Sequence, residues 1–236
     1  MINEMIQSTL LRSLPGITHG FVSNHTPAAR DALDAAEPTV ATVKQVHRDT
    51  VLWASAPEKR ARDADGLGTH TPGLSVGVYS ADCTPLLYAA TDAHGLPLAV
   101  MAVHAGWRGT ALEIAAKSLT EFASATPLAA KFYSAIGPCI SFESFEVGEE
   151  VVAAFPESLR LGQAKFLREE EGKKKYLFDL PGENKRQLQD CAARLGISLQ
   201  IELLPYCTLK LRDQFPSYRR DREKAGRLLS YLSFQR

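Results

Sequence analysis

The fold class of this chain is decided by the stretch LAVMAVHAGWRGT, which runs from Leu98 to Thr110. It opens with six apolar residues, and such a run predicts a buried strand. Two glycines then flank Trp107 and Arg108, and from Thr110 to Ala123 apolar residues recur at intervals of three and four. That spacing predicts an amphipathic helix, with Gly109 or Thr110 as its cap. A strand, a glycine-containing turn and a helix are therefore expected in succession.

Two further apolar, β-branched runs, Leu74–Tyr79 and Lys131–Ile136, predict strands of the same kind. Each ends at a short segment that contains a cysteine, Cys83 in the first case and Cys139 in the second. The strand before His104 ends in the same way, at a histidine. Because loops that follow rigid strands commonly carry chemistry, these three strand ends are candidate positions for a functional site.

Helical spacing predicts two more helices, Phe145–Phe155 and Glu183–Leu195, the second ended by Gly196. The other predicted elements are a strand at Ile197–Leu204, a strand or helix at Gly226–Phe234 and a solvated hairpin at Glu169–Lys175. Strands and helices thus alternate irregularly. We expect one domain over residues 1–236, of the α/β (α+β) class, with a mixed β-sheet flanked by helices.

Composition excludes several classes of protein. The 236 residues are 45% hydrophobic and 23% charged, with a formal net charge of zero, so no field favours nucleic acid or an anionic membrane. No apolar run is long enough for a transmembrane helix, and residues 1–14 do not resemble a secretory signal. The four cysteines are widely spaced. We therefore expect a reduced, cytoplasmic protein, and no pattern specifies its oligomeric state.

Three short segments each supply one potential metal ligand: Gln45-Val46-His47, Ala81-Asp82-Cys83 and the turn that begins at His104. Two imidazoles and one thiolate leave one corner of a tetrahedral site open, which is the ligand count of a catalytic metal centre. A lone cysteine after a strand is more often a small buried hydrophobe. Here Thr84-Pro85 places Cys83 on a turn rather than inside a strand, and Gly106 and Gly109 leave room beside His104.

The neighbouring residues allow a functional and a structural interpretation. Trp107 either stacks on a flat substrate or fills the core, and Arg108 either binds phosphate or carboxylate or forms a surface ion pair. Asp82 orients a ligand histidine, acts as a base or stabilises a turn. Asp63-Ala64-Asp65-Gly66 is interpreted as a turn with a candidate active-site acid. The remaining histidines are expected at the surface or at caps: His19, His25, His70 and His94.

The chain resembles a known family through a series of motifs in the family order. They are Gln-Val-His, Ala-Asp-Gly, Ala-Asp-Cys-Thr-Pro, His-Ala-Gly-Trp-Arg-Gly-Thr, Ile136-Gly137-Pro138-Cys139-Ile140 and Ser217-Tyr218-Arg219-Arg220-Asp221. On these motifs the sequence is similar to the YfiH family, the laccase-domain or "polyphenol oxidase" proteins, from about Ala41 to the C-terminus. It departs from the family pattern before that point, where Thr26-Pro27-Ala28-Ala29-Arg30 lacks the paired glycines of relatives.

The resemblance implies a fold of the YfiH and cytotoxic-necrotizing-factor type, with one zinc ion held by His47, Cys83 and His104. It implies an enzyme of purine nucleosides that carries out phosphorolysis of adenosine, inosine, guanosine or methylthioadenosine, deamination of adenosine, or both. Its partners would be the nucleoside and phosphate. The residues expected in catalysis are Cys83, Asp82 and Arg108, and those expected against the substrate are Trp107, Arg108 and Cys139.

Two other functions remain open. The same ligands suit copper and a laccase-like polyphenol oxidase, although six histidines are too few for a three-copper cluster beside a blue-copper site. A zinc-stabilised factor for quality control of cell-wall precursors would require no turnover. A closed site would favour that factor, with Cys139 or Cys207 as the fourth ligand.

Overall fold

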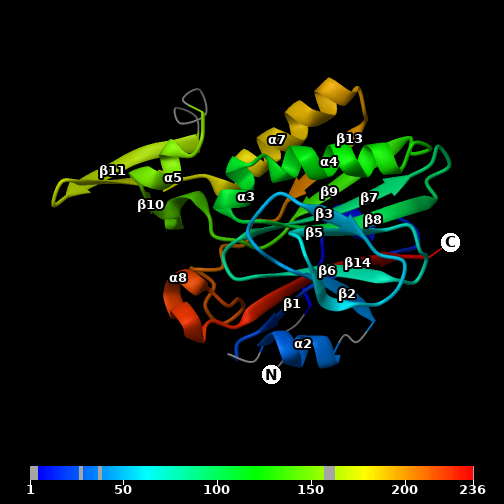
Figure 1. The fold of residues 1–236 in the computed structure, drawn as a ribbon, viewed down its shortest axis with the longest axis horizontal. Coiled ribbons are helices and arrows are strands. Elements are labelled where there is room, and N and C mark those ends of the chain that lie inside the picture. Colours follow the sequence, from blue (N-terminus) through cyan, green and yellow to red (C-terminus); the bar gives the residue numbers. More distant parts are fainter. Residues whose placement is uncertain (1–4, 27–28, 37–38, 157–162, 236) are drawn as a thin grey trace.

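Two stacked β-sheets form the centre of the computed structural model, which describes residues 5–26, 29–36, 39–156 and 163–235 (Figure 1). The segment Thr26–Arg30, where the sequence departs from the family pattern, includes residues 27 and 28, which lie outside the described residues. The larger sheet has the order β13-β9-β7-β8-β5-β3 and the smaller the order β1-β14-β6-β2-β4. Both contain parallel and antiparallel neighbours.

The strands of the larger sheet are β3 (Val51–Trp53), β5 (Gly66–Thr69), β7 (Thr84–Thr91), β8 (Pro97–Ala105), β9 (Lys131–Ile136) and β13 (Leu199–Leu203). Those of the smaller sheet are β1 (Ile17–Asn24), β2 (Val40–Lys44), β4 (Lys59–Asp63), β6 (Ser75–Ser80) and β14 (Arg227–Phe234). A third sheet, in the order β10-β12-β11, consists of β10 (Glu146–Gly148), β11 (Ala164–Glu170) and β12 (Lys173–Phe178).

The central strand β7 shows how the sequence builds these layers. Its side chains alternate between two hydrophobic clusters, with Leu87 and Ala89 in one, and Leu86 and Tyr88 in the other. The first cluster also contains residues of the smaller sheet, such as Val76, so it lies between the two sheets. The second contains residues of two helices. Both faces of the strand are therefore buried, and the run is largely apolar between the threonines at its two ends.

Helices cover the outer faces of the two sheets (Figure 1). The helices α4 (Ile114–Ala125) and α7 (Leu180–Leu195) lie over the larger sheet, and α2 (Ala29–Ala36) lies against the smaller one. The short helices are α1 (Thr9–Arg12), α3 (Trp107–Ala111), α5 (Glu149–Ala153) and α8 (Tyr218–Asp221), with 3₁₀ turns η1 (Phe142–Ser144) and η2 (Arg222–Lys224). None of the helices in the described ranges combines the length and the apolar character that a bilayer-spanning helix needs.

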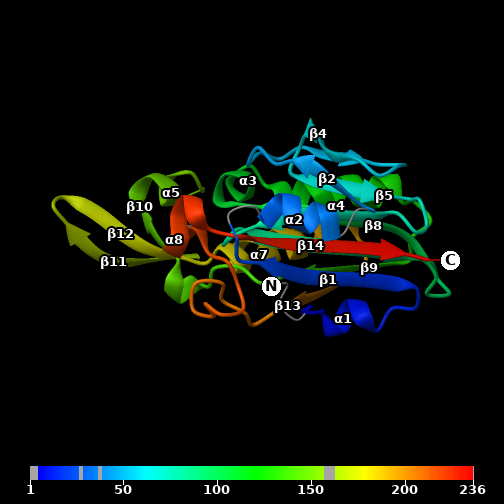
Figure 2. The ribbon, with the colours of Figure 1, turned by 90° about the horizontal axis from the view of Figure 1, so that it is seen from below.

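The third sheet projects from one end of the molecule, next to α5 and α8 (Figures 1 and 2). Its base is held by a separate hydrophobic cluster that includes Ile140, Phe145, Phe178 and Leu180. This cluster reaches the end of β9 and the start of α7. The projecting sheet therefore closes one side of the region where the strands β7 and β8 meet the loops.

The α/β prediction with mixed strand directions and flanking helices is confirmed, although the strands form three sheets rather than one. The predicted strand at Lys131–Ile136 has those bounds, and Gly226–Phe234 is a strand, β14. The hairpin around Glu169–Lys175 is also confirmed. Gly196 ends α7 in the left-handed conformation with φ 65°, as a glycine after a helix commonly does.

Three details of the prediction are wrong. The single helix over Thr110–Ala123 is two helices, because Glu113 has φ 63° and interrupts the hydrogen-bond ladder before α4. Phe145–Phe155 contains a short strand before α5. Pro85 lies inside the central strand β7, where it pairs with His104. A proline is accommodated there because it is the second residue of the strand, close to the end of the ladder.

Candidate metal centre

The three predicted ligands come together at one end of the stacked sheets. His47 follows β2, Cys83 immediately precedes β7, and His104 lies near the end of β8. Their ligand atoms all lie within 4.8 Å of one another, and the two imidazole rings stand nearly perpendicular at a centroid distance of 4.8 Å. Within the described ranges, these are the residues whose ligand atoms are close enough to share an ion.

Gly106 leaves the space that this cluster occupies. A Cβ atom at this position would lie 3.1 Å from the Cys83 sulfur, 3.3 Å from a carbon of the His47 ring and 3.6 Å from the His104 ring. The glycine is also the N-cap of α3, with a φ of −74° in the extended region. Its requirement is therefore space rather than an unusual backbone conformation, and the side chains that converge on it are the three candidate ligands.

A buried carboxylate, Asp65, holds two of the ligands in place. One oxygen is 2.9 Å from Nδ1 of His104, and the carboxylate accepts hydrogen bonds from the backbone N–H groups of Val46, His47 and Arg48. A proton on Nδ1 of His104 leaves Nε2 with a lone pair directed at the cluster. Burial by itself would raise the pKa of Asp65, but these donors lower it, so the group is ionised.

Gln45 fixes the end of β2 against β6. Its side-chain amide donates to the carbonyl of Tyr79 at 2.6 Å and accepts from the N–H of the same residue at 2.8 Å. The side-chain amide thus makes the two hydrogen bonds to Tyr79 that the backbone of a neighbouring strand would otherwise make. It determines where the following residues, including His47, leave the strand.

Cys83 and His104 each shift the pKa of the other. Burial disfavours both charged forms, but His104 and His47 lower the pKa of the Cys83 thiol. Against the same burial, Cys83 and Asp65 raise the pKa of His104. The sulfur is therefore available as a thiolate, the form in which cysteine binds metals. A soft thiolate with two imidazoles is a donor set that fits zinc, and it also fits copper.

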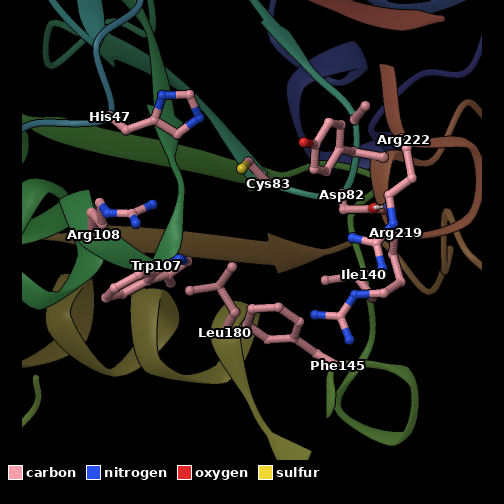
Figure 3. Close-up of a pocket in the computed structure, with 12 residues that line it drawn as sticks. His47, Asp82, Cys83, Trp107, Arg108, Ile140, Phe145, Leu180, Arg219 and Arg222 are labelled. Atoms are coloured by element: carbon pink, nitrogen blue, oxygen red, sulfur yellow. Dashed lines mark hydrogen bonds between the residues drawn. The ribbon is translucent and has the colours of Figure 1, made fainter. Parts of the chain in front are cut away.

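Cys83 opens into a cavity with an apolar floor and positively charged walls (Figure 3). Leu180 and Phe145 lie below it, Arg108 and Trp107 on one side, and Arg219 and Arg222 on the opposite side. We call this space the apolar cavity. The Arg108 guanidinium carbon lies 4.3 Å from the centroid of the Trp107 ring, so these adjacent residues stack on each other.

A second space adjoins the same cluster and is more polar. It is lined by His104 and by Gln45, Tyr79, Ser80, Glu223 and Arg227, and it shares His47, Cys83, Arg108 and Tyr218 with the apolar cavity. We call it the polar cavity. Since both spaces meet at the ligand cluster, one molecule with an apolar part and a polar part can occupy both at once.

Asp82 has a different environment from the one expected. Its carboxylate accepts hydrogen bonds from the hydroxyls of Thr208 and Ser217 and from the N–H of Arg219. The prediction that Asp82 orients a ligand histidine is wrong, because Asp65 makes that contact with His104. Asp82 instead joins the start of β7 to the C-terminal segment that carries Arg219 and Arg222.

The cysteines other than Cys83 lie away from the ligand cluster. Cys139 is buried and is not among the described residues that line either cavity. Its neighbour Ile140 lines the apolar cavity instead. The expectation that Cys139 faces the substrate is therefore corrected. Cys207 makes sulfur hydrogen bonds with Ser141 and Ser144, so neither cysteine joins the three ligands as a fourth.

The prediction for the remaining histidines is wrong for His19, which is fully buried in β1 and accepts a hydrogen bond from the N–H of Ser8. His70 and His94 are exposed, as expected. His19 lies on β1 and its contact is with the N-terminal segment, so it takes no part in the ligand cluster.

The sequence assigned no site role to several residues that line the apolar cavity, among them Phe145, Arg219 and Arg222. The motif Ser217–Asp221 was evident, but nothing in it indicated which side chains face the ligands. Backbone conformation adds a signal that only the structure provides. His47, Asp82 and Arg222 all have positive φ, of 59°, 83° and 53°. Such strain in non-glycine residues concentrates at functional sites.

Comparison with known proteins places this chain in one family. A sequence profile of the family described as multi-copper polyphenol oxidoreductase laccase matches residues 19–235. A Deinococcus radiodurans protein named purine nucleoside phosphorylase is 32% identical over 205 residues, 87% of this chain and 74% of that protein. A Bacteroides thetaiotaomicron protein of the same name is 36% identical over 186 residues, 77% of this chain and 66% of that protein. Purine nucleoside phosphorylase YfiH of Escherichia coli is 32% identical over 193 residues, 80% and 72% of the two chains.

Solved structures with the same fold are also similar over nearly the whole chain. The hypothetical protein YfiH of Bacillus licheniformis superposes with a TM-score of 0.73 at 25% identity and covers 93% of both chains. The protein NMB0706 of Neisseria meningitidis superposes with a TM-score of 0.71 at 25% identity and covers 99% of both chains. The mixed α/β fold is therefore shared along the length of these proteins.

Proposed function

Because this chain belongs to the YfiH family, described as multi-copper polyphenol oxidoreductase laccase, and its curated relatives are named purine nucleoside phosphorylases, we propose that it is a zinc-dependent purine nucleoside phosphorylase. The observation that carries the proposal is the convergence of His47, Cys83 and His104 around Gly106, at the junction of the two cavities.

The proposed ligands of the zinc ion are the Cys83 thiolate and the imidazoles of His47 and His104. The fit rests on the donor set, on the space that Gly106 leaves and on the carboxylate of Asp65 behind His104. When bound, zinc would supply Lewis-acid chemistry at the junction of the two cavities. The role of Asp65 is to keep the ring of His104 in the orientation and tautomer that metal binding requires.

The apolar cavity suits the purine, and the polar cavity suits the ribose. Trp107, Phe145 and Leu180 offer apolar surface to a flat base. Arg108 faces both spaces and, among the described residues, its guanidinium contacts the Trp107 ring rather than a carboxylate. It is the residue we assign to phosphate, because its planar fork matches two phosphate oxygens.

In the proposed reaction, a phosphate oxygen forms a bond to the anomeric carbon while the bond from that carbon to the purine nitrogen breaks. The purine leaves with the bonding electron pair and takes up a proton, so the products are ribose 1-phosphate and the free base. No oxidant is consumed. Arg108 contributes by holding the phosphate beside the anomeric carbon, which replaces a collision in solution with a fixed geometry.

A copper-dependent polyphenol oxidase is the alternative that the family description raises. Two histidines and a cysteine also suit a blue-copper centre. A multicopper enzyme needs further imidazoles around a second centre, and within the described ranges no other group of ligands close enough to hold an ion accompanies the first. The zinc proposal is favoured for that reason. The alternative without catalytic turnover is a zinc-stabilised factor for quality control of cell-wall precursors.

The test is chromatography of adenosine and inosine after incubation with zinc-loaded protein, with and without phosphate. Adenine or hypoxanthine that forms only with phosphate supports the proposal. Inosine formed from adenosine without phosphate would indicate a deaminase instead. Phenol oxidation with a blue absorbance band in copper-loaded protein would favour the oxidase, and no product in any arm would favour the non-catalytic alternative.

A second test removes the proposed thiolate ligand by substitution of Cys83. Cys83→Ala is expected to lose both zinc and phosphorolysis, because two imidazoles alone hold the ion weakly. Cys191→Ala is the control, since Cys191 is a buried cysteine on α7 whose sulfur contacts α4 and lies outside the ligand cluster. It is expected to retain both. Full activity and undiminished zinc in Cys83→Ala would refute the assignment of the site.

A further inference from the structure

The wall of the apolar cavity opposite Arg108 carries two guanidinium groups, those of Arg219 and Arg222 (Figure 3). The guanidinium of Arg219 donates one hydrogen bond, from Nη1 to the carbonyl of Glu146 at 2.6 Å, and it lies over the ring of Phe145. For Arg222, the part of the chain that the structure describes shows no ion pair with a carboxylate. Donors on both residues thus remain for a ligand.

The segment that carries these arginines is firmly held. Asp82 accepts from Ser217 and from the N–H of Arg219. Arg220 donates to the carbonyls of Thr208, Leu209 and Phe215. The backbone of Arg222 itself has φ 53° and ψ −130°, a conformation that costs energy for a residue with a side chain. The wall is therefore built into the fold before any ligand binds.

The side chains of this wall offer donors and almost no acceptors. Among the described residues that line the apolar cavity, Asp82 is the one with a carboxylate. That carboxylate already accepts three hydrogen bonds. The Tyr218 hydroxyl donates to Glu223, outside the apolar cavity. A base placed on the floor of Leu180 and Phe145 consequently meets N–H groups at this edge.

The two classes of purine differ at the edge that such donors recognise. A 6-oxopurine presents two acceptors side by side, O6 and N7, and a guanidinium pairs with both. A 6-aminopurine presents N7 beside an amino group, which is itself a donor and suits Asn or Gln instead. An arginine facing the amino group would place an N–H donor opposite another N–H donor. Both groups would lose water without gaining a hydrogen bond, which is unfavourable.

We propose that Arg219 and Arg222 select 6-oxopurine nucleosides, with Arg222 as the principal specificity-determining residue. This inference rests on the proposed function. It places the base on the apolar floor with O6 and N7 toward the two arginines, and phosphate on the opposite side at Arg108. As the bond from the anomeric carbon to N9 breaks, the electron pair moves into the purine, and the guanidinium groups stabilise the charge that reaches O6 and N7. N9 then takes a proton from solvent.

The experiment compares kcat/KM for the phosphate-dependent conversion of inosine to hypoxanthine and of adenosine to adenine. A bidentate arginine contact contributes about 1–3 kcal/mol of discrimination between bases, so the unmodified protein is expected to prefer inosine by roughly 5- to 150-fold. Arg222→Gln is expected to reduce that preference at least about tenfold, because a Gln amide matches the adenine edge. Zinc content and the KM for phosphate are expected to stay unchanged.

Arg212→Gln is the matched control, since Arg212 is an exposed arginine of the same C-terminal region that lines a different surface depression. Its inosine preference is expected to equal that of the unmodified protein. Calorimetric titration with the free bases gives a second readout, in which hypoxanthine binds more tightly than adenine and Arg222→Gln narrows the difference.

Equal use of adenosine and inosine, or an unchanged preference in Arg222→Gln, would overturn the inference and leave the proposed phosphorylase intact. Absence of turnover on both nucleosides would instead overturn the proposed phosphorylase. In that case the titration with the bases still decides the inference: tighter binding of hypoxanthine that depends on Arg222 supports it, and equal binding of the two bases, or none, refutes it.

Discussion

Asp65 illustrates how one residue can determine the geometry of a candidate metal site without being one of its ligands. Its carboxylate accepts three backbone N–H groups of the loop that carries His47, and it contacts the ring of His104. Two of the three ligands therefore depend on one negatively charged side chain. Carboxylates behind ligand histidines are known to set both ring orientation and basicity.

Asp65→Asn is expected to weaken zinc binding by about 10- to 100-fold, because the amide supplies one acceptor oxygen where four donors now converge. The affinity is measured by competition with a chromophoric chelator. Asp63→Asn is the matched control: Asp63 lies two residues away, is 61% exposed and pairs with Lys44 at the surface. An Asp65→Asn variant with the zinc affinity of Asp63→Asn would show that the carboxylate does not hold the ligands.

His19 is expected to make stability depend on pH at a position outside the cluster of candidate ligands. Burial lowers the pKa of His19 from 6.5 to about 4, and its Nε2 accepts the N–H of Ser8 at 2.8 Å. Because the unfolded chain takes up the proton first, the contribution of His19 to the free energy of unfolding is constant above the unfolded pKa and is expected to fall as pH drops from about 6.5 to about 4, by roughly 3 kcal/mol in total. Denaturant unfolding at a series of pH values measures this fall.

His19→Gln is expected to remove that part of the pH dependence, since its amide oxygen accepts from Ser8 without titrating. His94→Gln, a change at an exposed turn, is expected to leave it intact. If the His19→Gln and unmodified proteins lost stability in parallel between pH 6.5 and 4, the buried histidine would not be the origin.

At the scale of elements, the short helix α8 and the loop before it are positioned by Asp82. Thr208 and Ser217 donate their hydroxyls to this carboxylate, and Arg219 donates its N–H. Asp82 thus connects the start of the central strand β7 to the last irregular segment of the chain. Its carboxylate is engaged by structural partners, so we interpret it as a positioning residue rather than a base.

Two substitutions distinguish these interpretations. Asp82→Asn is expected to retain most activity and an unchanged pH profile, because an amide still pairs with two hydroxyls and Asn tolerates the positive φ of 83°. Asp82→Ala leaves three donors unpaired. It is expected to cost at least about 2 kcal/mol of stability and to increase hydrogen exchange over residues 208–222. A loss of kcat in Asp82→Asn with normal exchange protection would instead indicate acid–base catalysis.

At the scale of the whole molecule, the contact between the two sheets supports the site. Leu87 is fully buried between them, in the cluster that also contains Val76 of the smaller sheet. The ligands come from both sides of this contact, since His47 follows a strand of the smaller sheet and His104 belongs to the larger one. Their separation is therefore set by how the sheets pack.

Leu87→Ala is expected to reduce the free energy of unfolding by about 2–5 kcal/mol, through lost transfer energy and a cavity between the sheets. Leu128→Ala is the control, because Leu128 is 80% exposed, and it is expected to change stability by less than about 0.5 kcal/mol. Both are measured by denaturant unfolding. Similar stability losses in the two variants would argue against a tightly packed contact between the sheets.

Local patterning predicted two of the strands near the site, β8 and β9, but not β2 before His47 or β7 after Cys83. The apolar run before His104 and the β-branched run Lys131–Ile136 are strands because every residue in them can be buried on one face or the other. The ligand set could also be anticipated from the sequence, because His47, Cys83 and His104 each lie beside residues that mark strand ends and turns. What failed locally was the helix over Thr110–Ala123, where the left-handed backbone of Glu113 interrupts a regular apolar spacing.

The amino-acid sequence thus determined the class of fold, through the order of apolar and polar residues, and it indicated the three candidate ligands and the family, through short motifs and their resemblance to relatives. Only the tertiary structure decided that Asp65, and not Asp82, contacts a ligand histidine, and that Arg219 and Arg222 form the far wall of the cavity. These contacts join segments separated by 39 residues for Asp65 and His104, and by 137 for Asp82 and Arg219. The physical reason is that the packing of two sheets, and not local sequence, sets which distant side chains meet.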